Sequence, residues 1–190
     1  LMVHVQSRLL YNCCKAYPER VDLDWLEANP GRLFHTDTML EDRRLMLENK
    51  SCASCHYGCY KYEEQGLTST RQKYINDAKI SDPHAPVKEI TISLSTDCNM
   101  TCMYCSPEWS SSWQRDIDKH GEYILDGIPV RQNDRWSTMW SKMKQRSRGA
   151  ESRFFNLLLN EIKLASSLDS ITFMGGEPLL NNQLDSALDM

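Results

Sequence analysis

The stretch Cys98-Asn99-Met100-Thr101-Cys102-Met103-Tyr104-Cys105 places three cysteines in the spacing C-x3-C-x2-C near the middle of the chain. It follows residues 88–95, where β-branched and polar residues alternate as in a strand. Three thiolates can hold three irons of a cubane cluster and leave the fourth iron open to a small molecule. A cluster built only for electron transfer normally has four cysteines, so this spacing favours a site with chemistry at an open iron.

A second motif, Gly175-Gly176-Glu177-Pro178, follows the next predicted strand, residues 170–174. Glycines permit backbone conformations closed to other residues and let a ligand lie against the main chain. The Glu177 carboxylate can accept hydrogen bonds from a ligand ammonium group. Between the two strands, residues 151–168 predict a helix with one apolar face. Strand, loop, helix, strand and loop form a parallel βαβ unit, so both motifs are expected at the carboxyl ends of strands, where such folds place their chemistry.

Another group of cysteines, Cys52, Cys55 and Cys59, lies upstream. Residues two or three apart are awkward disulfide partners, whereas metal sites favour such spacing. A C-x2-C turn serves zinc and iron–sulfur sites alike, so a zinc site, an iron–sulfur site and a loop of free thiols are the alternatives, and we favour iron–sulfur. The side chains of adjacent Cys13 and Cys14 diverge, so we expect at most one of them to be a ligand.

The clearest boundary in the chain is residues 81–86, where two prolines exclude a helix and discourage a central strand. We therefore predict two domains, residues 1–85 and 86–190, of α/β class. In residues 1–85, other patterns predict a strand pair over 3–11, a short helix within 22–31 and a helix from Thr36 or Asp37 to about 49. In residues 86–190, they predict a helix over 108–118, a hairpin over 123–130 and a helix starting at Asn133 or Asp134.

Composition narrows the function classes. The 190 residues are 41% hydrophobic and 25% charged, with a formal net charge of −4. This balance gives no support for general nucleic-acid binding, and no apolar run approaches the roughly 18 residues of a membrane span. The first ten residues do not form a signal-peptide core. We therefore expect the eight cysteines to be metal-bound thiolates in a reducing cytoplasm rather than disulfides.

Together the two motifs resemble those of the radical SAM superfamily. Cys98-x3-Cys102-Met103-Tyr104-Cys105 is similar to its signature, and Gly175-Gly176-Glu177-Pro178 to its companion motif. The resemblance implies a partial (β/α)6 barrel, of which this chain holds the start, and a [4Fe–4S] cluster on the three cysteines. It also implies S-adenosylmethionine on the open iron, with Tyr104 near the adenine and the Gly-Gly-Glu loop receiving the methionine ammonium.

The resemblance implies an activity as well. An electron from a donor such as flavodoxin or ferredoxin would cleave S-adenosylmethionine to methionine and a 5′-deoxyadenosyl radical, which abstracts a substrate hydrogen. The substrate itself stays open, with a peptide or protein preferred over a small molecule on resemblance alone.

Residues 1–85 resemble the twitch domain, a small α+β relative of the SPASM domain that holds an auxiliary iron–sulfur cluster. The resemblance rests on Cys13-Cys14, Cys52-x2-Cys55 and the tail Glu63-Glu64-Gln65-Gly66-Leu67-Thr68-Ser69-Thr70-Arg71. It implies an auxiliary cluster on Cys13 or Cys14 together with Cys52 and Cys55. The sequence departs from the pattern of the twitch domain at two points: Arg8 occupies the place of an expected glycine, and an upstream cysteine is absent. For the missing ligand two alternatives stay open: Cys59 supplies it, or the cluster is incomplete because the N-terminus is cut.

We expect the chain to be a fragment. A six-unit barrel needs roughly 200 residues, and two βα units have been reached by Met190. The isolated chain is then expected not to turn over substrate.

Two alternatives to the enzyme belong to other classes. In a non-catalytic zinc-binding module, Cys52 and Cys55 would pair with two later cysteines. The separation from Cys52 to Cys98 exceeds the roughly 20 residues usual in zinc ribbons, and the Gly-Gly-Glu motif is left unexplained. An electron-transfer protein with two clusters is disfavoured by the three-cysteine motif.

Overall fold

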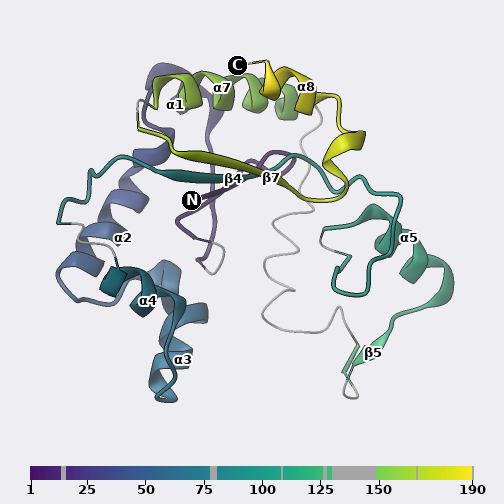
Figure 1. Ribbon diagram of the computed structural model, residues 1–190, viewed down its shortest axis with the longest axis horizontal. Coiled ribbons are helices and arrows are strands. Elements are labelled where there is room, and N and C mark those ends of the chain that lie inside the picture. Colours follow the sequence, from purple (N-terminus) through teal and green to yellow (C-terminus); the bar gives the residue numbers. More distant parts are fainter. Residues whose placement is uncertain are drawn as a thin grey trace.

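A five-stranded mixed sheet forms the centre of the molecule (Figure 1). The computed structural model describes residues 1–13, 16–77, 81–107, 109–125, 128–129, 149–165 and 167–189. In these residues the strand order is β3-β2-β1-β4-β7, with β1, β4 and β7 parallel and β2 and β3 antiparallel to their neighbours. The strands are β1 (Met2–His4), β2 (Leu9–Tyr11), β3 (Glu19–Arg20), β4 (Glu89–Ser93) and β7 (Ser170–Met174).

The helices lie on one face of this sheet and near the two ends of its central strands. One face is covered by α1 (Leu23–Ala28), α7 (Ala150–Leu164) and α8 (Gln183–Leu188) (Figure 1). Toward the end where β4 begins lie α2 (Asp37–Leu47), α3 (Lys61–Glu64) and α4 (Thr70–Asp77). Toward the end where β4 finishes lie α5 (Ser111–His120) and the antiparallel pair β5 (Ile124–Leu125) and β6 (Ile128–Pro129). Among the described residues, no helix has the length and apolar character to cross a membrane.

Shorter turns connect these elements. Three are 3₁₀ turns, η1 (Leu33–His35), η2 (Ala53–Cys55) and η5 (Pro178–Leu180), and one is a π-helical turn, η3 (His56–Tyr60). The sheet draws strands from both predicted domains, because β1 pairs in parallel with β4. The α/β class is therefore confirmed as an open mixed sheet, while the division at residue 85 stays a prediction.

The main core lies between the sheet and the helices that cover it. Successive side chains of a strand point to opposite faces, so the apolar residues of β1, β2 and β4 that face α7 alternate with residues on the other face. On α7, Leu158 and Ile162 are one turn apart and both buried. The buried members from these elements are Val3, Leu10, Ile90, Ile92, Phe154, Phe155, Leu158 and Ile162, and Leu94, directly after β4, belongs to the same core. A smaller cluster of Met2, Leu9 and Tyr11 packs separately, with Trp109 and Met174 against it.

Most of the predicted elements are confirmed. Thr36 is the N-cap of α2, and its Oγ1 accepts a hydrogen bond from Met39 N at 3.2 Å. The strand pair, the parallel strands and the hairpin are present where the patterns placed them. The helix predicted over 108–118 instead starts at Ser111, because Ser110 caps it, and the long helix ends at Leu164. The helix predicted from Asn133 or Asp134 lies outside the described residues.

One charged side chain is part of this core. Glu161 on α7 is 3% exposed, and its two carboxylate oxygens accept hydrogen bonds from Gly31 N (2.7 Å) and Leu33 N (2.9 Å). Both donors belong to the segment where the chain leaves α1 and enters η1, so no helix or strand supplies their acceptors. Glu161 therefore fastens this segment to α7.

Replacing Glu161 with alanine should lower the free energy of unfolding by about 2 kcal/mol, since two backbone donors lose their acceptors. Urea unfolding followed by circular dichroism measures the change. The control is Asn160→Ala, an exposed position beside it on α7, which should change the free energy by less than about 0.5 kcal/mol. Equal losses in the two variants would contradict the role of Glu161.

Candidate functional site

The two sequence motifs lie side by side at one edge of the sheet. β4 and β7 are parallel, in a register that pairs Ser93 with Met174, so the chain leaves both strands at the same edge. The cysteine loop (residues 96–107) follows β4, and the Gly-Gly-Glu loop (residues 175–177) follows β7. The predicted convergence of the two motifs at the carboxyl ends of parallel strands is confirmed.

The two glycines let these loops touch. Gly175 and Gly176 have φ values of +85° and +44°, in the left-handed region that favours glycine. A Cβ on Gly176 would lie 2.2 Å from the carbonyl oxygen of Asp97, and one on Gly175 would lie 2.2 Å from Ser93 Oγ. The close approach is therefore to the end of β4 and the main chain of the cysteine loop. Sequence reasoning had anticipated close approach only for a ligand.

Backbone hydrogen bonds join the loops at the same point. Glu177 N donates to the carbonyl oxygen of Asp97 at 2.8 Å, directly before Cys98. Gly176 N donates to the carbonyl oxygen of Trp109 at 2.7 Å. A movement of either loop therefore breaks hydrogen bonds of the other.

The first turn of α5 holds the carbonyl and amide of Cys98. Cys98 N donates to Ser111 Oγ at 3.0 Å. The Cys98 carbonyl oxygen accepts from Ser112 Oγ at 2.6 Å and from Arg115 Nη2 at 3.1 Å. These contacts fix the main chain of the first cysteine without using its sulfur.

The rest of the cysteine loop is fastened by the same helix. Trp113 Nε1 donates to the carbonyl oxygen of Cys102 at 2.9 Å, and Ser110 Oγ donates to that of Met100 at 3.0 Å. Sequence reasoning missed the holding role of residues 110–113 and 115. The run of three serines at the start of an amphipathic helix predicts an N-cap, but this local pattern does not identify the loop that the serines also contact.

The three thiols of the loop differ in exposure. Cys98 is buried, whereas Cys102 and Cys105 are half-buried. Met100 N donates to Cys98 Sγ at 3.4 Å. Tyr104 is 92% exposed, and a hydrogen bond with Cys102, followed by the charges of Cys102 and Cys105, raises its pKa. The phenol and these two thiols therefore lie close together at the surface.

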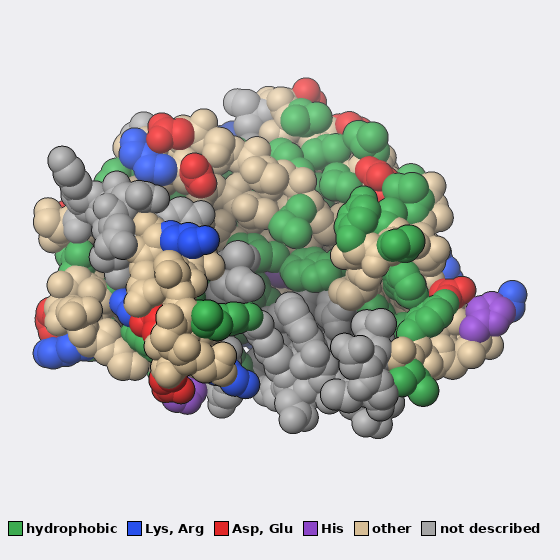
Figure 2. Space-filling model, turned by 60° about the horizontal axis from the view of Figure 1, so that its bottom comes forward, with side chains coloured by type: hydrophobic (Ala, Val, Ile, Leu, Met, Phe, Trp, Pro, Cys, Tyr) green, Lys and Arg blue, Asp and Glu red, His purple; other side chains and the backbone are tan. Residues whose placement is uncertain are grey.

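Glu177 and Pro178 continue the same edge. Glu177 is half-buried, and its Oε1 accepts a hydrogen bond from Leu179 N at 3.2 Å, which caps η5 beginning at Pro178. The carboxylate thus has a local structural role besides the predicted recognition of an ammonium group. Two apolar side chains here are exposed: Met103 of the cysteine loop at 97% and Leu179 of η5 at 82%. Figure 2 shows hydrophobic side chains gathered on one side of the molecule (right).

The second group of cysteines also comes together. Cys52, Cys55 and Cys59 are buried. The hydrogen bond from Cys55 is the main cause that lowers the pKa of Cys52 to about 6. The same bond, burial and the charges of Cys52, Cys13 and Cys59 raise the pKa of Cys55. The charges of Cys52, Cys13 and Cys59 therefore act on Cys55, while Cys14 lies outside the described residues.

The two cysteine groups lie toward opposite ends of the strands. Cys13 follows β2, which runs antiparallel to β1, whereas Cys98 follows β4, which runs parallel to β1. The five residues of β4, at about 3.3 Å each, separate these ends by roughly 16 Å. One binding site cannot draw ligands from both groups without breaking the sheet, which disfavours a zinc module that joins Cys52 and Cys55 to the later cysteines.

Both groups fit iron–sulfur ligation by the chemistry of their donors. Each offers several thiols and a hydrogen-bond donor directed at a sulfur, from Met100 N at Cys98 and from Tyr60 Oη at Cys52. In the part of the chain that the structure describes, no three His, Cys, Asp or Glu side chains converge on a position for a metal ion. A tetrahedral zinc gathers its sulfurs within about 4 Å of one another. A cubane instead takes one thiolate at each iron corner.

Comparison with known proteins gives no match to a family model, a curated protein or a solved structure. Any assignment of function therefore rests on the residues and their geometry.

Replacing Gly176 with alanine should separate the two loops, because the new Cβ cannot occupy the space beside Asp97. We expect a loss of unfolding free energy of about 3 kcal/mol. The matched control is Gly149→Ala, which has φ +91° and ψ −24° in the left-handed region and no atom within 4 Å of the new Cβ, and should lose about 1 kcal/mol. Urea unfolding of both variants measures the difference, and equal losses would show that the loops do not depend on this contact.

Proposed function

We propose that this chain belongs to a radical SAM enzyme with an auxiliary iron–sulfur cluster. The observation that carries the proposal is the direct contact between the cysteine loop and the Gly-Gly-Glu loop at the carboxyl edge of parallel strands. A site for S-adenosylmethionine at a three-cysteine cluster requires both loops at once. Neither a zinc module nor an electron-transfer protein needs the second loop.

Each residue of this edge has a role in the proposal. Cys98, Cys102 and Cys105 would each ligate one iron and leave the fourth for the amino and carboxylate groups of S-adenosylmethionine. Tyr104, which is almost fully exposed, offers a ring that an adenine can lie against. Glu177 offers a carboxylate for the methionine ammonium. When bound, the cluster and S-adenosylmethionine supply hydrogen-atom abstraction by a 5′-deoxyadenosyl radical.

In the proposal, the residues around the cysteine loop fix the positions of the cysteine ligands. The hydrogen bonds from Ser112 and Arg115 to the Cys98 carbonyl oxygen fix the first ligand, and the Trp113 indole fixes the main chain of Cys102. Because the loop is anchored before a cluster binds, less conformational entropy is lost on binding.

We assign the auxiliary cluster to Cys13, Cys52, Cys55 and Cys59. The resemblance to the twitch domain implies Cys52, Cys55 and one of Cys13 and Cys14. One backbone feature supports this resemblance. Arg8 stands where that family has a glycine, and its φ is +54°, in the left-handed region. The turn between β1 and β2 thus has the conformation that a glycine favours, although the residue is an arginine.

The remaining parts of the proposal follow from the resemblance. The electron donor is a protein of the flavodoxin or ferredoxin kind, and the substrate is a peptide, a protein or a small molecule, with a peptide or protein preferred. The cytoplasmic location rests instead on the cysteine usage of the sequence. Residues 86–190 would supply the first units of a (β/α)6 barrel and residues 1–85 the twitch-like domain.

Iron counting after anaerobic reconstitution with iron and sulfide tests the proposal. We expect about eight irons per chain, falling to about four in Cys102→Ala and to about four in Cys52→Ala, because each substitution removes one of two cubane clusters. Thr101→Ala, an exposed position between the loop cysteines, should keep the full count and serves as the control. Zinc in place of iron in the wild-type chain would overturn the proposal in favour of a non-catalytic metal-binding module.

A further inference from the structure

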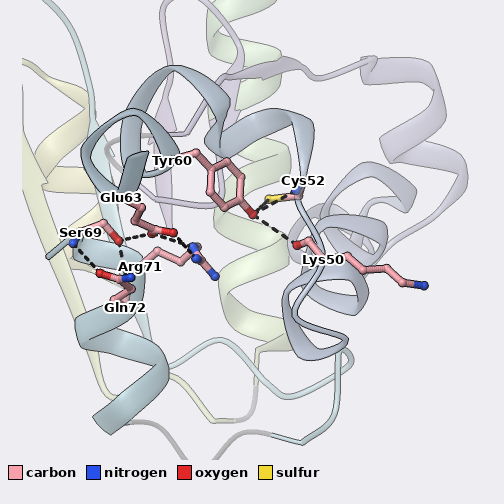
Figure 3. Close-up of polar contacts among 7 residues, drawn as sticks. All are labelled: Lys50, Cys52, Tyr60, Glu63, Ser69, Arg71 and Gln72. Atoms are coloured by element: carbon pink, nitrogen blue, oxygen red, sulfur yellow. Dashed lines mark hydrogen bonds and ion pairs between the residues drawn. The ribbon is translucent and has the colours of Figure 1, made fainter. Parts of the chain in front are cut away.

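A series of polar contacts runs from the start of α4 to the second cysteine group (Figure 3). Ser69 and Gln72 form a capping box: Gln72 N donates to Ser69 Oγ at 3.1 Å, and Ser69 N donates to Gln72 Oε1 at 3.1 Å. The Ser69 hydroxyl in turn donates to Glu63 Oε1 at 2.5 Å. The start of α4 therefore fixes the position of the Glu63 carboxylate.

Glu63 holds Arg71 in the next step. The two side chains form an ion pair, with Arg71 Nε 3.1 Å from Glu63 Oε1 and Arg71 Nη2 bonded to Glu63 Oε2. The side chains are only 13% (Arg71) and 16% (Glu63) exposed, so water and salt screen the pair less than one at the surface. The guanidinium carbon of Arg71 lies 4.9 Å from the centre of the Tyr60 ring, within the range of a cation–π contact.

The Tyr60 hydroxyl reaches Cys52. It accepts a hydrogen bond from Cys52 N at 3.1 Å, and its one hydrogen can be donated either to Cys52 Sγ (3.7 Å) or to the carbonyl oxygen of Lys50 (3.3 Å). A deprotonated sulfur attracts a donor more strongly than a neutral carbonyl does. When Cys52 serves as a thiolate ligand, its sulfur is therefore the preferred acceptor for this hydrogen.

We propose that Tyr60 is a positioning residue for Cys52 and raises the reduction potential of the auxiliary cluster, with Glu63 and Arg71 bracing its ring. This inference rests on the proposed function, which assigns that cluster to Cys13, Cys52, Cys55 and Cys59. A reduced cluster carries one more negative charge than an oxidised one. A donor at a ligand sulfur consequently stabilises the reduced form more, and the potential rises. In this proposal the segment from Glu63 to Arg71, which was part of the resemblance to the twitch domain, has a physical role: it holds the ring of Tyr60.

An EPR-monitored redox titration of the reconstituted full chain, with dithionite as reductant, tests the role of Tyr60. The signal to follow is the one that S-adenosylmethionine does not change. Tyr60→Phe should shift its midpoint potential to a more negative value and keep the iron count. Tyr123→Phe is the control, because it also removes a bonded hydroxyl, here to Asp116, in the distant segment after α5. That variant should leave the potential unchanged.

The outcomes separate this inference from the proposed function. If the wild type has two clusters and Tyr60→Phe leaves the potential unchanged, the role of Tyr60 is overturned and the proposed function stands. If Cys52→Ala leaves the wild-type iron count unchanged, the auxiliary cluster and the role of Tyr60 both fall.

Glu63→Gln tests the brace. Removing a nearby negative charge by itself raises the potential of a cluster, whereas loosening Tyr60 lowers it. The shift caused by Glu63→Gln should therefore be more negative in the wild type than in the Tyr60→Phe background, where no hydroxyl is left to misplace. Equal shifts in the two backgrounds would overturn the brace.

Discussion

The close approach of Gly176 to the carbonyl oxygen of Asp97 is the contact on which the candidate site depends. Parallel pairing of β4 and β7 brings the ends of both strands to one edge, but it does not bring the loops together. The last step requires a backbone without a Cβ at Gly176, because any other residue would place a carbon 2.2 Å from that oxygen. The cysteine loop and the Gly-Gly-Glu loop therefore form one structural unit.

The cysteine loop is held from two directions, and its sulfurs take little part in holding it. On one side the Gly-Gly-Glu loop bonds to Asp97, and on the other the first turn of α5 bonds to the carbonyl oxygens of Cys98, Met100 and Cys102. The second cysteine group follows the same principle, since the contacts of Tyr60 are anchored in α4. At both places neighbouring groups set the positions of the cysteines.

Sequence patterns predicted the local elements and the convergence of the two motifs. Period-two alternation predicted β4, and a short strand was predicted at β7. A cap at Thr36 or Asp37 predicted the start of α2, and the βαβ order predicted the shared edge of the motifs. Contacts between distant parts of the chain were not predictable. The pairing of β1 with β4 and the acceptor role of Glu161 depend on partners about 90 and 130 residues away, and no local period encodes such partners. Likewise, the spacing of Cys52 and Cys55 predicts a metal site but says nothing of Tyr60.

The most direct test of the central claim is EPR of the reduced chain with and without S-adenosylmethionine, in the wild type and in Glu177→Gln. We expect the cofactor to alter the signal that Cys102→Ala abolishes. We also expect Glu177→Gln to need about tenfold more cofactor for the same change, since the charge that meets the ammonium is lost while an amide oxygen can still cap η5. An intact cluster whose signal ignores the cofactor would contradict the claim that the two loops form one binding site.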